Sequence, residues 1–191
     1  MRKIVFDIET QNFFHDTGSN DPASLDIACV CTYDSESNCY ESYRKETLND
    51  LWPMLEKTDL LIGFNSDHFD IPLLNKYYRG DLTKIKSIDL LKEVRKSLGR
   101  RLKLDTLAAA TLGRNKTADG AMAGVWWKNG EYEKVIQYCI EDVRITKDIY
   151  DYARAHGHLK YRDGDKVKEI PLDTSMWEEK EERGRTNMLP F

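Results

Sequence analysis

The sequence of 191 residues has no apolar run that approaches the roughly 20 residues needed to cross a membrane. We expect no signal peptide, because the apolar part of MRKIVFDIET is too short and acidic residues interrupt it. Internal repeats and long linkers are also absent. We therefore expect a cytoplasmic protein with no membrane partner, in which residues 1–157 form one domain and residues 158–191 form an appendage.

Cysteine is sparse, with four residues and no CxxC pair. A zinc site built from Cys29, Cys31 and Cys39 is one interpretation, but structural zinc sites favour paired cysteines. The favoured alternative is that the cysteines are small buried apolar residues in a reducing compartment. The phosphate-binding pattern GxxxxGK[ST] is missing too, which excludes a Walker loop.

Neither sign of charge dominates the whole chain, since the net charge is −4. Residues 79–116 differ, because eleven basic and four acidic residues give this segment a net charge of +7. The remainder of the chain therefore carries −11. A solvated helix face would explain the basic segment, and so would a surface that follows the phosphates of a nucleic acid.

The N-terminal half is predicted to contain several strands. KIVFDIE is typical of a strand with Ile4, Phe6 and Ile8 on one face. SLDIACVCTYD and NCYESYR are expected to pair as a hairpin around DSESN, and DLLIGFN is expected to be a buried strand. Between them, TLNDLWPMLEK predicts a short helix with Thr47 as its N-cap.

The remainder is predicted to be mainly helical, in DIPLLNKYYR, SIDLLKEVRKSLG, KLDTLAAATLG and from about residue 131 to 155. RNKTADGAMAG is expected to be a loop. HLKYRDGDKVKEIPL predicts a small C-terminal β-hairpin around Asp163 and Gly164. Strands followed mostly by helices indicate an α/β fold with a mixed central sheet flanked by helices.

Asp7 and Glu9 are two residues apart on the first strand, so both side chains point to the same face. Two like charges there repel each other unless a cation lies between them, and Mg²⁺ prefers carboxylate ligands. Solvent exposure is the alternative for this pair. A second acidic group follows the strand DLLIGFN, where Asp67 is interpreted as a helix cap and Asp70 falls in the first helical turn.

The long helix carries a third acidic position. Asp142 lies on an apolar stripe with neighbours at three- and four-residue spacing: Val135, Cys139, Thr146, Ile149 and Ala153. A buried carboxylate is costly unless it is paired or bound to a metal. Tyr138 lies one turn before Asp142 on an adjacent part of the same surface. An Arg or Lys partner for Asp142 is the alternative to a metal.

The segments FDIET, GFNSDHFDIPLL and YCIEDV resemble, in this order, the three motifs of the DEDD 3′–5′ exonucleases. The Tyr-x-x-x-Asp form of the third is typical of the DEDDy branch. The second is most similar to the proofreading domains of family B DNA polymerases and their stand-alone relatives. The resemblance covers roughly residues 3–152 and implies a ribonuclease H-like fold.

The resemblance also implies roles for individual residues. Asp7, Glu9, Asp70 and Asp142 would hold two divalent metal ions, Mg²⁺ or Mn²⁺, which stabilise the attacking and leaving oxygens of phosphoryl transfer. Tyr138 would orient the attacking water. Substrate contacts are expected from four further residues: Thr10, Asn65, Phe69 and Lys116. Core packing is the alternative for Phe69.

The expected activity is metal-dependent 3′–5′ release of mononucleotides from single-stranded DNA. An RNA exonuclease, a non-catalytic nucleic-acid-binding module and an endonuclease of the ribonuclease H type are the alternatives. We expect no polymerase domain after the third motif, so that proofreading would act in trans with a polymerase. The final residues TNMLPF resemble bacterial sliding-clamp docking peptides, with Thr186 where a glutamine is expected. A plain exposed tail is the alternative.

Overall fold

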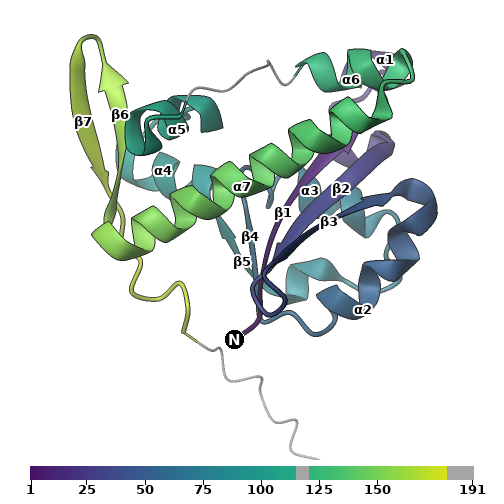
Figure 1. Ribbon diagram of the computed structural model, residues 1–191, viewed down its shortest axis with the longest axis horizontal. Coiled ribbons are helices and arrows are strands. Elements are labelled where there is room, and N and C mark those ends of the chain that lie inside the picture. Colours follow the sequence, from purple (N-terminus) through teal and green to yellow (C-terminus); the bar gives the residue numbers. More distant parts are fainter. Residues whose placement is uncertain (115–120, 180–191) are drawn as a thin grey trace, which may run out of the picture.

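The computed structural model describes residues 1–114 and 121–179 and contains a five-stranded mixed sheet (Figure 1). The strand order is β3-β2-β1-β4-β5. The first three strands in the chain pair antiparallel, whereas β1, β4 and β5 are mutually parallel. The strands are β1 (Lys3–Thr10), β2 (Ile27–Asp34), β3 (Cys39–Arg44), β4 (Leu60–Gly63) and β5 (Lys86–Asp89).

Helices cover both faces of this sheet, as the α/β prediction requires (Figure 1). One face packs against α2 (Trp52–Leu55) and α3 (Asp70–Asn75). The other packs against α4 (Leu90–Leu98), α5 (Leu104–Leu112), α6 (Ala121–Lys128) and α7 (Tyr132–His156). A short helix, α1 (Phe14–Thr17), follows the first strand. Because both faces are covered, β2 is buried over almost its whole length.

The alternation predicted for β1 is confirmed. Ile4, Phe6 and Ile8 belong to the apolar cluster on the α2–α3 side, whereas Val5 belongs to the cluster under α7. Asp7 and Glu9 share the face of Val5 because side chains alternate along a strand. The two carboxylates are thereby directed to the side of the sheet that α7 crosses.

Helix α7 has 25 residues and ends at Gly157, whose φ of 70° suits the left-handed C-cap position. Every member of its predicted stripe is buried, including Asp142 at 6% exposure. The helix packs against β1 and β2 through this stripe. The prediction of an inward-facing aspartate on the long helix is therefore confirmed.

Several local predictions were wrong. Residues 121–124, predicted as the end of a loop, are the first half of α6, and residues 86–89 form β5 before α4 begins. Thr47 does not start a helix, since residues 45–50 form a 3-10 helix and its hydroxyl accepts from the N–H of Arg44. These errors share one cause, because the local propensities of short segments are overridden by packing on the sheet.

The predicted C-terminal hairpin is present as β6 (His158–Asp163) and β7 (Lys166–Pro171). Its two-residue loop, Gly164 and Asp165, lies one position later than expected. The hairpin packs on α5, and Leu159 and Ile170 are fully buried in the same cluster as α7. A domain boundary near residue 157 stays a prediction.

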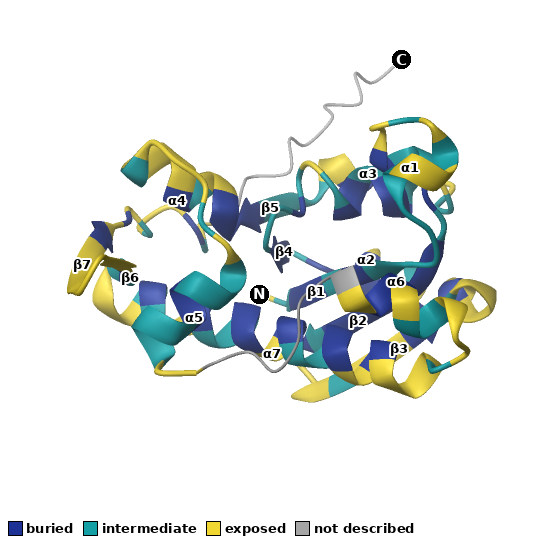
Figure 2. Cartoon of the chain, turned by 90° about the horizontal axis from the view of Figure 1, so that it is seen from above, coloured by how far each residue is buried: buried dark blue, intermediate teal, exposed yellow. Residues whose placement is uncertain are grey.

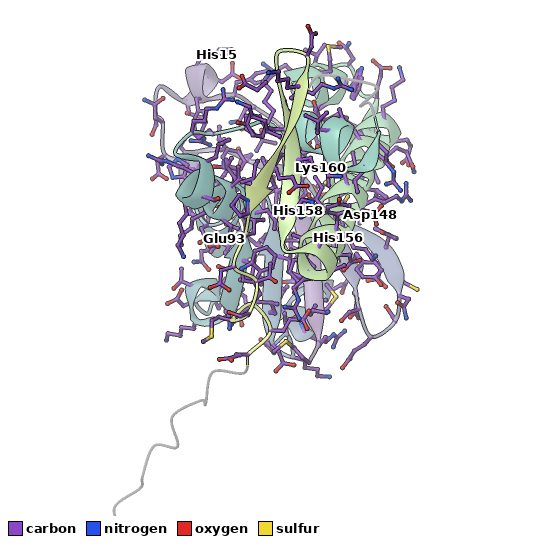
Figure 3. All side chains as sticks on the ribbon, turned by 90° about the vertical axis from the view of Figure 1, so that its left-hand side faces the viewer. His15, Glu93, Asp148, His156, His158 and Lys160 are labelled. Atoms are coloured by element: carbon purple, nitrogen blue, oxygen red, sulfur yellow. The ribbon has the colours of Figure 1, made fainter. Side chains whose placement is uncertain are left out.

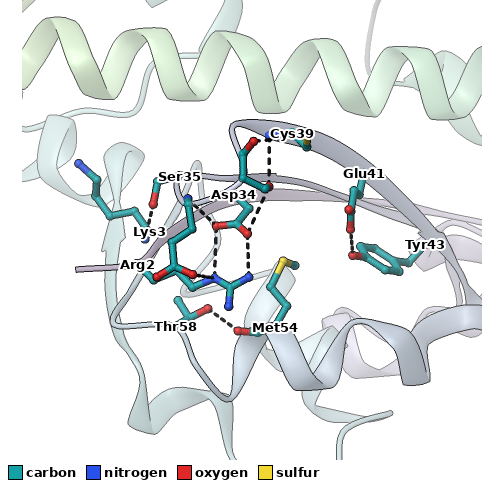
Figure 4. Close-up of polar contacts among 11 residues, drawn as sticks. Arg2, Lys3, Asp34, Ser35, Cys39, Glu41, Tyr43, Met54 and Thr58 are labelled. Carbon is teal, nitrogen blue, oxygen red and sulfur yellow. Dashed lines mark hydrogen bonds and ion pairs between the residues drawn. The ribbon is translucent and has the colours of Figure 1, made fainter.

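Polar contacts tie the chain ends to the sheet. Arg2 makes a two-pronged ion pair with Asp34, through Nη2 to Oδ2 at 2.7 Å and Nε to Oδ1 at 3.2 Å (Figure 4). After β7, Trp177 stacks on Tyr150 of α7 with ring centroids 5.5 Å apart.

No helix within residues 1–114 and 121–179 has an apolar stretch long enough to span a bilayer.

Candidate active site

Three predicted carboxylates meet on the α7 side of the sheet. Asp7 and Glu9 come from β1 and Asp142 comes from the middle of α7. Ligand oxygens of these three side chains all lie within 4.8 Å of one another. Asp7 and Glu9 are half-buried and Asp142 is buried.

The chemistry of this donor set fits a hard divalent cation. Carboxylate oxygens are the ligands preferred by Mg²⁺ and Mn²⁺, and three of them from two elements converge here. Mutual repulsion of clustered carboxylates is relieved when a cation binds between them. Asp7, Glu9 and Asp142 are therefore the residues that could hold a metal ion.

Asp70 lies beside this group but outside the set of mutually close oxygens. It is the first residue of α3, is 4% exposed, and accepts a hydrogen bond from the backbone N–H of Ile8, between Asp7 and Glu9. Burial raises the pKa of Asp70 to about 8, and the charge of Asp89 adds to this shift. Hydrogen bonds from the backbone N–H groups of Asp70 and Ile8 oppose it.

The sheet itself makes room for Asp70. Strand β4 pairs with β1 only from Lys3 to Val5, so the second half of β1 has no strand on that side. Helix α3 starts after the loop that follows β4, and its first residue reaches the open edge of β1. Gly63 permits the turn, since a Cβ there would lie 2.4 Å from the Ser66 side chain.

Tyr138 is buried at 8% exposure, one turn before Asp142 on α7. Its ring meets that of Trp126 edge-on, with centroids 5.9 Å apart and planes at 67°. This contact with α6 restricts the ring, so the phenol is held near the turn that carries Asp142.

An adjoining cavity of about 770 Å³ is lined by Glu9, Thr10 and the rings of Phe13, Phe14 and Phe69. Phe14 and Phe69 meet edge-on at 6.1 Å, and Phe69 also packs on the core, as its alternative interpretation expects. The substrate contact of Phe69 stays a prediction. Thr10 donates to the carbonyl of Asn12. Across the cavity, Gly124 of α6 admits the Phe13 ring, which a Cβ would approach to 2.3 Å.

Asn65 adopts a left-handed backbone with a φ of 67°, which is uncommon for a residue other than glycine. Its N–H donates to Oδ1 of Asp89 at 2.8 Å, and its side-chain oxygen accepts from Nη2 of Arg101 at 2.7 Å. Asp89 also accepts from the N–H groups of Asp67 and Leu91. This buried carboxylate therefore fixes the loop between β4 and α3.

Sequence reasoning missed Asp89 and assigned Asp67 wrongly. Asp67 caps no helix; it binds Nζ of Lys92 at 2.9 Å and accepts from the Ser87 hydroxyl at 2.5 Å. Asp89 is the N-cap of α4, and a capping signal at that position could have found it. Its second role depends on a contact between segments 24 residues apart.

The favoured interpretation of the cysteines as small buried residues is confirmed for Cys29, Cys31 and Cys139, whose sulfur atoms lie within 4.8 Å of one another in the core. It is wrong for Cys39, which is exposed at the start of β3. Burial raises the pKa of the Cys139 thiol well above its ordinary value, and hydrogen bonds with Cys29 and Cys31 add to the shift. This trio forms the layer below the carboxylates.

Lys116 and the peptide from Thr186 to Phe191 lie outside the described residues. The substrate contact and the clamp-docking role predicted for them stay predictions. Of the other expected site residues, the structure gathers Asp7, Glu9, Tyr138 and Asp142, with Asp70 at the open edge of β1.

Comparison with known proteins decides the family, because the model of the RNase H superfamily matches residues 4–154. The chain belongs to the RNase H superfamily. This confirms the resemblance at the level of the family and the predicted fold, a mixed sheet flanked by helices with a C-terminal hairpin. A search of curated proteins finds no match.

Solved structures share the RNase H-like fold at low sequence identity. The family B DNA polymerase of the archaeon Pyrobaculum calidifontis is 17% identical with a TM-score of 0.62, over 80% of this chain and 24% of the polymerase. RNase D of Trypanosoma brucei is 14% identical with a TM-score of 0.58, over 78% of this chain and 56% of RNase D. The chain thus spans only part of either neighbour, and the likeness to both shows the fold.

Proposed function

We propose that the chain is a metal-dependent 3′–5′ exonuclease that releases mononucleotides from the 3′ ends of single-stranded DNA. The observation that carries the proposal is the convergence of Asp7, Glu9 and Asp142 within 4.8 Å, with Tyr138 one turn from Asp142. Membership of the RNase H superfamily supports nuclease activity.

Asp7, Glu9 and Asp142 would hold the metal ions, Mg²⁺ or Mn²⁺, and Asp70 would complete the set at the edge of β1. When bound, two such ions stabilise the attacking and leaving oxygens of an in-line displacement and lower the pKa of a bound water. Tyr138 would orient that water by a hydrogen bond. Tyrosine is a weak base at neutral pH, because its ordinary pKa is about 10.

The aromatic cavity next to Glu9 supports a single-stranded 3′ end as the substrate. A terminal base that is free of a partner strand can stack on side chains such as Phe14 and Phe69, which line this cavity. Thr10 at the end of β1 would contact the same nucleotide. Stacking of this kind is tolerant of sequence, which suits an enzyme that removes successive nucleotides.

An RNA 3′–5′ exonuclease is the second candidate, because the structural neighbours include RNase D as well as a DNA polymerase. Single-strand binding by stacking and charge differs little between DNA and RNA. We favour DNA because the second sequence motif is most similar to that of family B polymerases.

The test compares matched DNA and RNA oligonucleotides that carry a 5′ fluorophore, with Mg²⁺, Mn²⁺ or EDTA. We expect a ladder that shortens from the 3′ end, faster on DNA, and no cleavage of a circular single strand. Asp7→Ala should abolish cleavage, whereas the control Glu141→Gln, on the exposed side of α7, should retain it. Cleavage that persists in Asp7→Ala, or its absence with every metal and substrate, would overturn the proposal.

A further inference from the structure

A second groove, of about 420 Å³, flanks the loop between β4 and α3. Asn65 and His68 line it from the loop, and Arg95 and Arg101 line it from α4 and the segment after it. The same loop carries Phe69, which lines the aromatic cavity next to Glu9. One short loop therefore separates the groove from the cavity, and the backbone N–H of Phe69 donates to the carbonyl of Asn65 across it.

The acidic side chains in this groove already have donors of their own. Asp89 is buried and accepts hydrogen bonds from backbone N–H groups of the loop and of α4. Asp67 forms an ion pair with Lys92 at 2.9 Å. Neither carboxylate is thus available to the two arginines that share the groove.

Arg95 and Arg101 are exposed, and within residues 1–114 and 121–179 no ion pair joins either of them to a carboxylate. Most of the other basic side chains in these ranges do form an ion pair with a carboxylate. Lys76 pairs with Asp26, for example, and Arg154 pairs with Glu178. The Nη2 of Arg101 is fixed on Asn65, which leaves its other guanidinium N–H groups for a ligand.

Two further basic side chains lie between the groove and the hairpin. Arg100 lies over the ring of Tyr161 at 5.3 Å, which joins the segment after α4 to β6. Lys160, on the same strand, lies over the ring of Tyr152 at 5.8 Å and faces the viewer in Figure 3. Figure 2 shows α4, α5 and the hairpin together on one side of the sheet.

We propose that the groove of Asn65, Arg95 and Arg101 binds the phosphodiester backbone of the single strand whose 3′ end lies in the aromatic cavity. A guanidinium suits this ligand, because its paired N–H groups match two phosphate oxygens. Asn65 is a positioning residue that holds Arg101, and its left-handed backbone sets the direction of its side chain. This inference rests on the proposed function and adds the path of the strand.

The test measures the binding of 5′-fluorescein single strands, one of DNA and one of RNA, by anisotropy in EDTA at several KCl concentrations. Arg95→Ala with Arg101→Ala should raise Kd about tenfold or more at low salt. The slope of log affinity against log salt should become shallower by about 1.4, which is two phosphate contacts at roughly 0.7 each. Lys57→Ala with Arg79→Ala removes the same charge elsewhere and should change neither quantity appreciably.

Asn65→Gly tests the positioning of the Arg101 side chain without removing its charge. Glycine keeps the left-handed backbone but removes the amide that holds Arg101, so Kd should rise while the salt slope is retained. Equal losses on DNA and RNA support the inference, since phosphate is common to both. A double arginine variant that matches its control, or a loss on RNA alone, would overturn it.

Failure of the inference and failure of the proposed function are distinguishable. Suppose that the double arginine variant binds the strand as tightly as the unchanged protein, and that the unchanged protein shortens the strand with Mg²⁺. Only the proposed path of the strand is then wrong. If the unchanged protein neither binds nor shortens either strand, both proposals are wrong.

Discussion

The thiol of Cys139 donates to the main-chain oxygen of Asp7 at 3.4 Å, and its sulfur lies 3.6 Å from Oδ2 of the same residue. The contact joins α7 to β1 directly beneath the carboxylate cluster. The way α7 is docked on the sheet therefore sets two contacts at once. It places Cys139 under Asp7, and it places Asp142, one turn further along α7, beside Asp7 and Glu9.

Only one of the four cysteines should react rapidly with a thiol reagent in the folded protein. Cys39 is exposed, whereas the other three are fully buried, and the raised pKa of Cys139 keeps that thiol protonated. Titration with Ellman's reagent should give one fast thiol without denaturant and four in denaturant. Cys39→Ala should remove the fast thiol, and a burst of three or four in the native state would contradict the packing.

Divalent metal should stabilise the folded protein through the carboxylate cluster. A ligand that binds only the folded state at 100 times its Kd adds about 2.7 kcal/mol. Thermal unfolding with Mg²⁺ or Mn²⁺ should therefore show a higher midpoint than unfolding in EDTA. Asp142→Asn should lose most of this increase, whereas Glu141→Gln should keep it, because Glu141 pairs with Arg144 outside the cluster. Equal increases in both variants would show that metal binds elsewhere.

Tyr138→Phe should lower kcat about 100-fold with little change in the metal-dependent rise of the unfolding midpoint. The substitution keeps the ring that packs on Trp126 and removes only the hydroxyl proposed to orient water. Single-turnover cleavage and thermal unfolding measured on one preparation separate these effects. Unaltered cleavage would remove Tyr138 from the mechanism, and Trp126→Phe serves as the packing control.

Asp89→Ala should lower the free energy of unfolding by roughly 2 kcal/mol, because it leaves the N–H groups of Asn65 and Leu91 without their acceptor. Cleavage should fall more steeply than stability, since the same loop leads to Asp70. Urea unfolding and cleavage rates provide the two readouts. Asp81→Ala is the matched control, because Asp81 is also a cap, and it accepts from the N–H and the hydroxyl of Thr83 at an exposed position.

Acid should weaken the ion pair between Asp34 and Arg2. Burial acts to raise the pKa of Asp34, but hydrogen bonds from Arg2 and from the N–H of Glu36 lower it below its ordinary value. The stability that this ion pair contributes is fully present above the pKa of Asp34 in the unfolded chain, about 3.9. It is lost as the pH falls through the lower pKa of Asp34 in the folded protein. Asp34→Asn should cost about 1–3 kcal/mol at pH 7 in urea unfolding, and the difference should shrink below about pH 4.

The parts of the site that follow a regular period could be predicted. The two-residue repeat of β1 set the direction of Asp7 and Glu9, and the helical repeat of α7 set that of Asp142. Contacts between separate elements could not be predicted in this way. Asp89 reaches Asn65 across 24 positions, and the third thiol of the core trio comes from α7 rather than β3.

Composition misled where packing decides the conformation. Residues 121–124 contain Gly124 and end a polar segment with a second glycine, which is typical of a loop, yet they begin α6. The glycine serves a contact instead, since it admits the ring of Phe13 against the helix. The local sequence around Gly124 does not indicate Phe13 as its partner, because the two residues lie far apart in the chain.

The segment that follows the hairpin is fastened at the end of the sheet where the parallel strands begin. Glu178 pairs with Lys3 at the start of β1, and the carbonyl of Glu179 accepts from Lys86 at the start of β5. Asp7 and Glu9 lie toward the other end of β1. The contacts of this segment and the carboxylate cluster therefore lie toward opposite ends of β1. A partner bound to the segment after β7 would leave the proposed active site accessible to an incoming strand.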